Sequence, residues 1–266
     1  MTGTATWIEN LQILEQAARL LGRDSDASAF QAELNTEEHA FQSAFFKASE
    51  NSYASGSQTA LAMPIAIGFA PESSRSALVD NLVADIRRAG NHTTAGDIGY
   101  RYVIEALMNA GRSDVIYDMA TQTTPPSYAA QLATGATSLT EAWDANPHSS
   151  QNHLMLGHIE EWFFGGLGGI RPDPNSPGLR HIIIDPQPAG DVKWTKCSWE
   201  TFRGPVSVEW HLEQGKFRIS IELPPGMSAD LHLPAASHDK HLHLIRQEGK
   251  RFVYGIASGR YELEVR

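Results

Sequence analysis

The sequence predicts a helical part followed by an antiparallel β-sandwich. Up to about residue 165, apolar residues recur every three or four positions, which is the spacing of an amphipathic helix. After Gly169 they recur at every second position, as they do in strands. The charge changes at the same place: residues 1–169 carry 8 Lys and Arg against 19 Asp and Glu, whereas residues 170–266 carry 13 against 12. We therefore expect domains at 1–169 and 170–266, joined by a Pro, Asn and Gly-rich linker near 170–179.

The helical part is expected to contain about seven helices. The first predicted helix carries an apolar stripe of Trp7, Leu11, Leu14, Ala18 and Leu21, and Gly22 stops it. The other predicted helices lie at 27–45, between Pro71 and Gly90, and at 58–69, 98–110, 114–121 and 149–164. Short loops and the lack of strand patterns between these helices favour an all-α array of antiparallel pairs.

The predicted sandwich begins with clear alternation. Residues 206–212 and 217–223 each place apolar side chains at every second position, and Gln214-Gly215-Lys216 between them is typical of a hairpin turn. Further short strands are expected at 181–185, 231–233, 242–245, 251–254 and 261–265.

Composition excludes several classes of protein. The 266 residues carry a formal charge of −10, which disfavours a nucleic-acid partner because phosphate binding relies on Lys and Arg. The single Cys197 excludes an intrachain disulfide and a cysteine-based metal cluster. No apolar run is long enough to span a membrane, and no signal peptide is visible at the start. The motifs of serine hydrolases, nucleotide-binding enzymes and zincins are absent, so we expect no cofactor.

Residues 135–157 hold the most chemically informative group of side chains. Glu141, Trp143, Asn152 and His153 lie there among small residues, together with Asp144. A carboxylate beside a tryptophan suits a sugar site, since the ring covers the apolar face of a pyranose while the carboxylate moves a proton. The alternative is that Thr140, Glu141 and Asp144 cap the start of a helix.

Two other groups have competing interpretations. Asp97, within residues 92–102, is either a functional carboxylate or the N-cap of the following helix. His232, His241 and His243 alternate as metal ligands in a strand do, but they lack an accompanying carboxylate cluster. Solvated strand faces explain these histidines better, so we expect no metal site.

The order of several separated motifs is similar to that of a known family. GATSLTEAWD at 135–144 followed by SSQNHLMLGHIEEWFFGGLGGIRP at 149–172 resembles the α-L-rhamnosidases of glycoside hydrolase family 78. Earlier segments agree: LGR at 21–23, QTALAMP at 58–64, TTAGDIGYRYVIEAL at 93–107 and NAGRSDVIYDM at 109–119. The resemblance runs through essentially the whole chain.

The resemblance implies an (α/α)6 barrel with a C-terminal β-sandwich, and hydrolysis of terminal α-L-rhamnose from glycans or glycosides with inversion. Glu141 matches the general base that activates water, and His153 matches a residue that binds rhamnose hydroxyls. Asn152 precedes it in the motif, and Trp143 matches part of the same wall. Asp97 matches a pocket residue of only a subgroup that carries GDIGY.

The resemblance also implies that a part is missing. About seven helices make only part of a twelve-helix barrel, and the family's general acid lies in the first half. We expect a complementary upstream half or self-association. The sequence leaves the location unknown: cytoplasmic, or periplasmic if the upstream half carries a signal. The alternatives are a catalytically silent fragment that binds carbohydrate or is structural, and a different (α/α)6 glycosidase.

Overall fold

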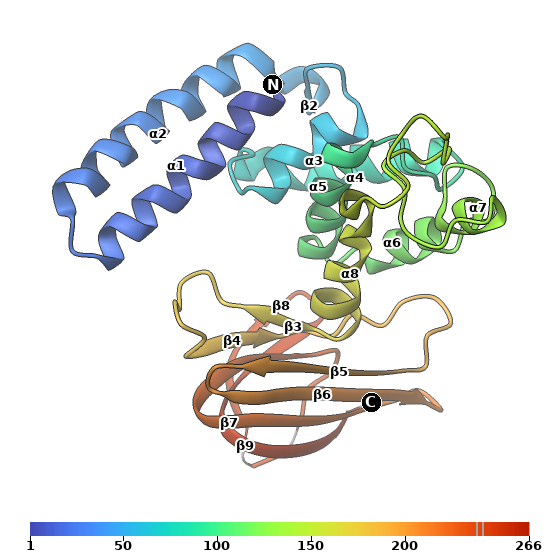
Figure 1. The fold of residues 1–266 in the computed structure, drawn as a ribbon. Helices are drawn as coiled ribbons and strands as arrows, with labels where there is room; N and C mark the ends of the chain where they lie inside the picture. The colour runs from blue at the N-terminus through green and yellow to red at the C-terminus, as the bar shows by residue number, and fades with distance from the viewer. Residues whose placement is uncertain (238, 241, 266) are drawn as a thin grey trace. The chain divides into compact units, whose positions relative to one another are not determined.

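The computed structural model describes residues 1–237, 239–240 and 242–265. The chain forms two compact units, one made of Met1–Ala110 with Met119–His158 and one made of Gly111–Asp118 with Ile159–Arg266. The first unit is helical and the second contains the large sheet, so the predicted order of helices and then strands is confirmed (Figure 1). Within the described residues, no helix is both long and apolar enough to cross a bilayer.

The two units do not coincide with a single division after residue 169. Three helical elements belong wholly or mostly to the second unit: α6 (Ser113–Ala120), α8 (Ile159–Trp162) and the π-helical turn η3 (Phe163–Leu167). Buried hydrogen bonds explain this grouping. The Trp162 indole donates to Ser113 Oγ at 2.8 Å, and Ser113 Oγ donates to Gln187 Oε1 at 2.6 Å. These bonds connect α6 and α8 to the segment that follows the first strands of the sheet.

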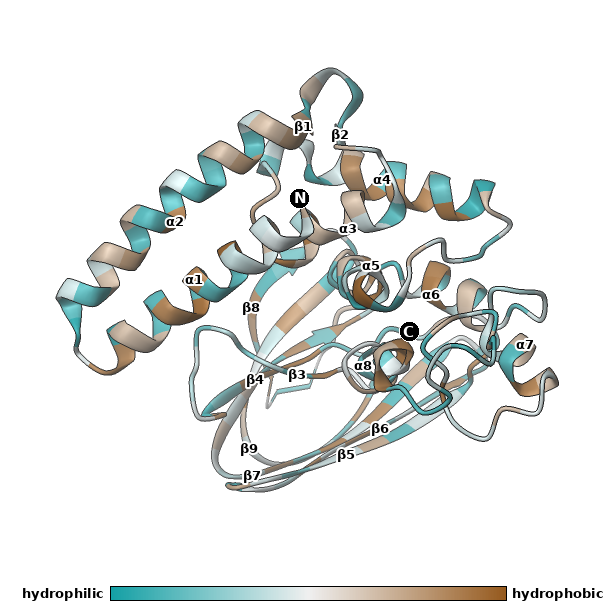
Figure 2. Ribbon diagram, turned by 45° about the horizontal axis from the view of Figure 1, so that its top comes forward, coloured by the Kyte–Doolittle hydropathy of each residue, from teal (hydrophilic) through white to brown (hydrophobic). Residues whose placement is uncertain are grey.

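The helical unit begins with a hairpin of α1 (Thr2–Leu20) and α2 (Asp24–Phe45), which lie side by side (Figure 1). The predicted helix is present, but its predicted apolar stripe is only partly buried. The buried residues of α1 are Ala5, Ile8, Leu11, Glu15 and Ala18. Trp7 is 41% exposed, Leu14 40% and Leu21 75%. The buried face combines Ile8 and Leu11 with small alanines, which allow close packing. Figure 2 shows hydrophobic residues along α1.

The rest of the helical unit contains four further helices: α3 (Gln58–Ala66), α4 (Glu72–Arg88), α5 (Asp97–Asn109) and α7 (Tyr128–Ala133). As its composition indicates, α3 is buried along most of its length. It packs closely on α5, because a Cβ on Gly99 would lie 2.0 Å from Thr59 Oγ1. Two elements of this unit were not predicted: α7, and a small hairpin of β1 (Phe46–Lys47) and β2 (Ser52–Tyr53) around the 3-10 turn η1 (Ala48–Glu50).

The predicted helix at 149–164 is wrong in its first part. Residues 149–153 are not helical, η2 (Leu154–His158) is a 3-10 helix, and only α8 is α-helical before the π-helical turn. The cause is a competing set of hydrogen bonds. The backbone N–H of Ser150 donates to the Glu141 carboxylate and that of His153 donates to the Leu139 carbonyl, so these groups are used across the loop.

The second unit is built on a seven-stranded sheet with two long strands. Its strands are β3 (Ile170–Pro172), β4 (His181–Ile184), β5 (Trp194–Thr201), β6 (Gly204–Glu213), β7 (Lys216–Leu233), β8 (His243–Glu248) and β9 (Arg251–Val265). The β7 strand pairs with β9 on both sides of a register break between Leu223 and Ser228. Before the break its other neighbour is β6, and after the break it is β4. The break at Pro224, Pro225 and Gly226 thus divides one sheet into two layers.

The strand predictions are mostly confirmed, with several differences. The β6–β7 hairpin turns at Gln214 and Gly215, both with positive φ, as Gln214-Gly215-Lys216 indicates. However, 231–233 is the end of β7, and 251–254 and 261–265 are two parts of β9. Strand β5 was not predicted because it carries tryptophans on both of its faces. Strand β3 lies inside the predicted linker, and β4 pairs with β7 in parallel, not antiparallel.

The core between the layers encloses the single cysteine. Cys197 on β5 is 8% exposed, among residues such as Val208, Trp210 and Ile221. Burial, with a smaller contribution from the charge of Glu160, raises the pKa of the Cys197 thiol to about 11. At pH 8 about one such thiol in a thousand is the reactive thiolate.

We therefore expect Cys197 to resist iodoacetamide at pH 8 in the folded protein. Mass spectrometry after timed labelling should show little alkylation of the native protein and complete alkylation in urea, where burial is lost. Rapid, stoichiometric labelling of the native chain would contradict the burial of β5.

Candidate active site

Glu141 lies in a loop that is closed by reciprocal hydrogen bonds. The Ser150 N–H donates to Glu141 Oε2 at 2.9 Å, and the Glu141 N–H donates to the Ser150 carbonyl at 2.9 Å. Glu141 is half-buried, so its carboxylate is held in place by the backbone while it still reaches solvent. A held carboxylate with a free oxygen is suited to positioning a water molecule and accepting its proton.

His153 lies in the segment that bonds to the residues just before Glu141. Its N–H donates to the Leu139 carbonyl at 2.8 Å, two residues before the glutamate. His153 Nδ1 accepts a 3.4 Å hydrogen bond from the Met155 N–H, which assigns the ring proton to Nε2. Asn152 is exposed, and its Oδ1 accepts from Ser138 Oγ at 2.9 Å. The structure therefore brings Glu141, Asn152 and His153 into one loop pair.

Trp143 connects this loop to the segment before α5. Its indole N–H donates to the Ala95 carbonyl at 2.9 Å, and its ring packs edge to face on Tyr100 and Tyr128, at centroid distances of 5.1 and 5.3 Å. Tyr100 is 2% exposed, and burial raises its pKa to about 12. Trp143 is thus a half-buried member of an aromatic cluster that holds two loops together.

The Trp143 hydrogen bond leads to a prediction. Changing Trp143 to Phe keeps an aromatic ring but removes the donor to Ala95, so we expect the free energy of unfolding to fall by about 1 kcal/mol. Trp143→Ala should cost more, because the contacts with Tyr100 and Tyr128 are also lost. Urea denaturation measures both. Equal free energies of unfolding for Trp143→Phe and Trp143→Ala would show that the aromatic cluster contributes nothing to stability.

The capping interpretations of the acidic residues are wrong. No helix begins at residues 140–144, and Thr140 Oγ1 donates instead to the Ala142 carbonyl at 2.7 Å. Asp144 closes a local turn: hydrogen bonds from the Asn146 side chain and backbone hold the pKa of its carboxyl below the ordinary value.

Asp97 is the first residue of α5, and Gly96 is the N-cap of that helix. Asp97 Oδ1 accepts a hydrogen bond from the Ile98 N–H at 2.8 Å.

Asp97 is connected to the loop of Glu141 only indirectly. It follows Ala95, the residue whose carbonyl accepts from Trp143, by two positions. Its carboxylate is half-buried at the N-terminus of α5, where the helix dipole favours a negative charge.

The histidines of the second unit do not form a metal site in the residues that the structure describes. No group of three or more His, Cys, Asp or Glu side chains is close enough there to hold a metal ion. Burial lowers the pKa of His232, and His243 is exposed on β8. His241 lies outside the described residues.

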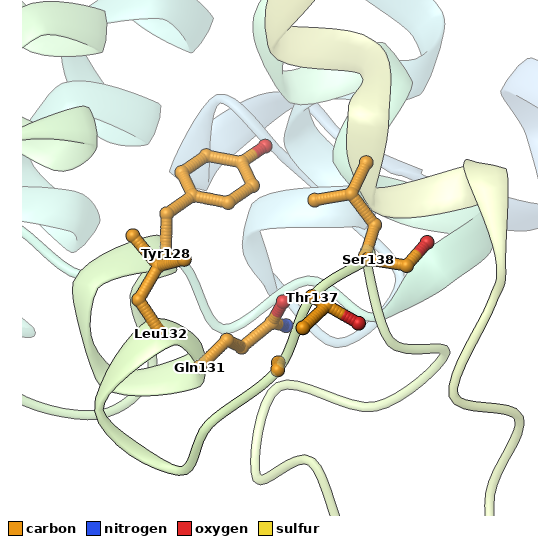
Figure 3. Close-up of a pocket in the computed structure, with 7 residues that line it drawn as sticks. Tyr128, Gln131, Leu132, Thr137 and Ser138 are labelled. Carbon is orange, nitrogen blue, oxygen red and sulfur yellow. The ribbon is translucent and has the colours of Figure 1, made fainter.

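The sequence analysis missed a cavity beside this loop. A cavity of about 360 Å³ lies between α7 and residues 136–139, with Tyr128, Gln131 and Leu132 on the helix side (Figure 3). In the sequence, Ser127 after two prolines could have indicated that a helix starts there. In the structure Ser127 is the N-cap of α7, and its Oγ accepts a hydrogen bond from the Ala130 N–H.

The class of protein follows from the fold, the site and comparison with family models. A helical part followed by a β-domain agrees with the order of the two domains that the family models match. Residues 1–167 match the bacterial alpha-L-rhamnosidase six-hairpin glycosidase domain, and residues 169–244 match the bacterial alpha-L-rhamnosidase C-terminal domain. The chain therefore belongs to the bacterial alpha-L-rhamnosidase family.

Relatives agree in sequence and in fold. The chain is 28% identical to an alpha-L-rhamnosidase of Streptomyces avermitilis over 98% of its own length and 26% identical to one of Alteromonas sp. over 100%. The crystal structure of the Streptomyces avermitilis alpha-L-rhamnosidase complexed with L-rhamnose matches 99% of the chain with a TM-score of 0.89. The alpha-L-rhamnosidase from Dictyoglumus thermophilum, 27% identical, matches 98% with a TM-score of 0.85.

The matched region is a minor part of each relative. The chain spans 26% of the Streptomyces avermitilis protein, 30% of the Alteromonas protein and 31% of the Dictyoglumus thermophilum chain. The similarity therefore concerns about a quarter to a third of those proteins.

Proposed function

We propose that this chain supplies the base side of an inverting α-L-rhamnosidase, with Glu141 as the general base. The observation that carries the proposal is the loop closed by Glu141 and Ser150, which fixes one oxygen of the carboxylate, while the segment of Asn152 and His153 bonds to the residues just before Glu141. Membership in the alpha-L-rhamnosidase family supports the reaction, and a relative crystallised with L-rhamnose supports the sugar.

The proposed reaction is the hydrolysis of a terminal α-L-rhamnoside. Glu141 accepts a proton from water as the water oxygen forms a bond to the anomeric carbon. The bond from that carbon to the aglycone oxygen breaks, and a carboxylic acid on the opposite face of the sugar protonates the leaving oxygen. Glu141 and the acid thus perform separate proton transfers, as in other inverting glycosidases.

The neighbouring side chains have proposed roles in binding the sugar. His153 carries its proton on Nε2, because Nδ1 accepts from Met155, and Nε2–H can donate to a rhamnose hydroxyl. The Asn152 side chain is exposed and offers an amide to another hydroxyl. Trp143 is assigned to the wall of the sugar site, and its indole N–H holds the segment that leads to Asp97. Asp97 is the most peripheral of these residues.

We further propose that the general acid belongs to a complementary segment, equivalent to the rest of the relatives. The chain corresponds to 26–31% of three of those proteins. The outer face of α1 supports such a partner, since Ile13 and Leu20 are 59% and 65% exposed, in addition to Trp7, Leu14 and Leu21. Apolar side chains concentrated on one helix face are typical of an interaction surface.

The test is an assay of 4-nitrophenyl α-L-rhamnoside with the chain alone and with a segment that supplies the missing part. We expect hydrolysis with the complementary segment, and NMR of the first product should show the inverted anomer. A retained anomer, or no hydrolysis in the completed protein, would contradict the proposal. A second candidate is binding of carbohydrate without catalysis, for which Asn152 and His153 offer hydrogen-bonding groups. Rhamnose binding with no turnover in the completed protein would identify it.

A further inference from the structure

Gln58 is a fully buried polar residue that the proposed function does not use. It is the first residue of α3, it opens the QTALAMP segment of the sequence, and it is 0% exposed. The residue before it, Ser57, is the N-cap of this helix, and Ser57 Oγ accepts from the Ala60 N–H at 3.3 Å. The start of α3 is thus held by its own cap, so the Gln58 amide is available to bond elsewhere.

Both ends of the Gln58 amide bond to one backbone segment. Gln58 Nε2 donates to the His92 carbonyl at 3.2 Å, and Gln58 Oε1 accepts from the Thr94 N–H at 2.8 Å. The two partners are alternate residues of that segment, so the amide takes the place that a neighbouring strand would have. Loss of either bond would leave a buried polar group unpaired, and the segment is therefore held in a single position.

The same segment carries the hydrogen-bond acceptor of Trp143. Thr93 is 5% exposed, and its Oγ1 accepts from the Ala95 N–H at 3.1 Å, which fixes the next residues. The Ala95 carbonyl accepts from the Trp143 indole at 2.9 Å. Ala95 directly follows Thr94, the partner of Gln58. A change at Gln58 therefore reaches the group that holds Trp143.

Trp143 connects this segment to the loop of the candidate base. It stands two residues after Glu141, inside the loop that the hydrogen bonds between Glu141 and Ser150 close. Those bonds tie the loop to itself, whereas the Trp143 indole ties it to the segment before α5. The place of the loop within the helical unit thus depends on where the Ala95 carbonyl lies.

We propose that Gln58 is a positioning residue of the candidate active site: through residues 92–95 and Trp143, its amide sets the place of the Glu141 carboxylate. This inference rests on the proposed function, since it names a residue that holds the same site. Because Gln58 is fully buried, it acts only through these residues. An error of about 1 Å in the position of a catalytic group can lower the rate about 10²-fold.

The first test follows the Trp143 indole N–H by NMR in the 266-residue chain, with its signal assigned from Trp143→Phe. Gln58→Met keeps the length of the side chain but removes both hydrogen bonds. We expect the Trp143 indole N–H to exchange with solvent about tenfold faster in this variant, because the Ala95 carbonyl is no longer held. The indole signals of Trp162 and Trp210, which are bonded within the second unit, should be unchanged. An unchanged Trp143 signal would overturn the proposal.

Gln42 provides the matched control within the same unit. Gln42 Nε2 donates to the Phe69 carbonyl at 2.8 Å and its Oε1 accepts from the Tyr53 hydroxyl at 2.8 Å, so Gln42→Met also removes both bonds of an amide. We expect Gln42→Met to lower the free energy of unfolding but to leave the exchange of the Trp143 indole unchanged. Equally fast exchange in the Gln42 and Gln58 variants would overturn the proposal, because the effect would then follow general destabilisation.

Gln58→Glu separates positioning from a failure to fold. A carboxylic acid can donate to the His92 carbonyl and accept from the Thr94 N–H, as the amide does, whereas a carboxylate can only accept. Burial raises the pKa of such a carboxyl, so both bonds form at acidic pH and one is lost as the pH rises through that pKa. The Trp143 exchange rate of the variant, divided by that of the parent at the same pH, should approach one at acidic pH and grow as the pH rises. A ratio that is the same at every pH would overturn the proposal.

Turnover distinguishes failure of this role from failure of the proposed function. In the completed protein, Gln58→Met should lower kcat roughly 10- to 100-fold with little change in KM, and Gln42→Met should leave kcat unchanged. If Glu141→Gln retains turnover, the proposed function fails, while faster Trp143 exchange in Gln58→Met still shows that Gln58 holds the loop. If turnover depends on Glu141 but Gln58→Met keeps the kcat of the parent, only the role of Gln58 is wrong.

Discussion

Glu141→Gln is expected to lower the hydrolysis of 4-nitrophenyl α-L-rhamnoside by about 10²–10⁴-fold in a protein that contains this chain and its complementary segment. The amide keeps the shape of the side chain and still accepts from the Ser150 N–H, so the loop should stay closed. It cannot take a proton from water, however. The loss should therefore appear in kcat, with little change in the binding of the rhamnoside.

A glutamate elsewhere provides the matched control. The Glu72 side chain on α4 is 87% exposed and pairs with Arg75 at the surface, so Glu72→Gln should leave kcat unchanged. A Glu141→Gln protein with activity within a few-fold of the parent would remove Glu141 from the role of base. An equal loss in both variants would indicate general destabilisation.

Gly169→Ala is expected to destabilise the second unit by about 2–5 kcal/mol. Gly169 adopts a φ of +78°, and an added Cβ would lie 2.3 Å from the backbone nitrogen of Pro186. Its carbonyl also accepts from the Asp185 N–H at 2.8 Å, which fixes the entry into the sheet. The variant thus combines left-handed backbone strain with a clash against main-chain atoms that cannot move aside.

Gly215→Ala separates the two effects within the same unit. Gly215 has a φ of +75° in the β6–β7 turn, but nothing lies within 4 Å of an added Cβ. We expect it to cost only about 1 kcal/mol. In both variants, the urea concentration at which half of Cys197 becomes labelled measures the unfolding of this unit. Similar midpoints for Gly169→Ala and Gly215→Ala would contradict the close approach to Pro186.

Glu141 could be selected from the sequence because it stands two residues before a tryptophan, in a segment rich in small residues. Sequence reasoning alone could not exclude a helix cap there, since caps use the same residue types. The structure excludes it, because residues 141–149 form turns and the Glu141 carboxylate bonds to Ser150. The pairing of these two residues depends on a contact across the loop that no local pattern encodes.

The apolar stripe predicted for α1 is only partly right, for a related reason. Its spacing of apolar residues correctly indicates a helix, but it fits more than one buried face. Alanines at positions 5 and 18 are buried and Trp7 is partly exposed, since the packing of the whole unit selects the face. Hydropathy favours the bulkier residues, so the predicted stripe contained the buried Leu11 and Ala18 but also Trp7, Leu14 and Leu21, which are exposed.

The sequence by itself determined the order of helices and strands, the turn at Gln214 and Gly215, and the family to which the chain belongs. Those features depend on periodicity and on residues close together in the chain. Only the tertiary structure decided that β4 joins β7 in parallel, that residues 149–153 leave the helix to hold Glu141, and that Gln131 faces a cavity. Such features arise from contacts between distant segments, and their free energy depends on how the complete unit packs.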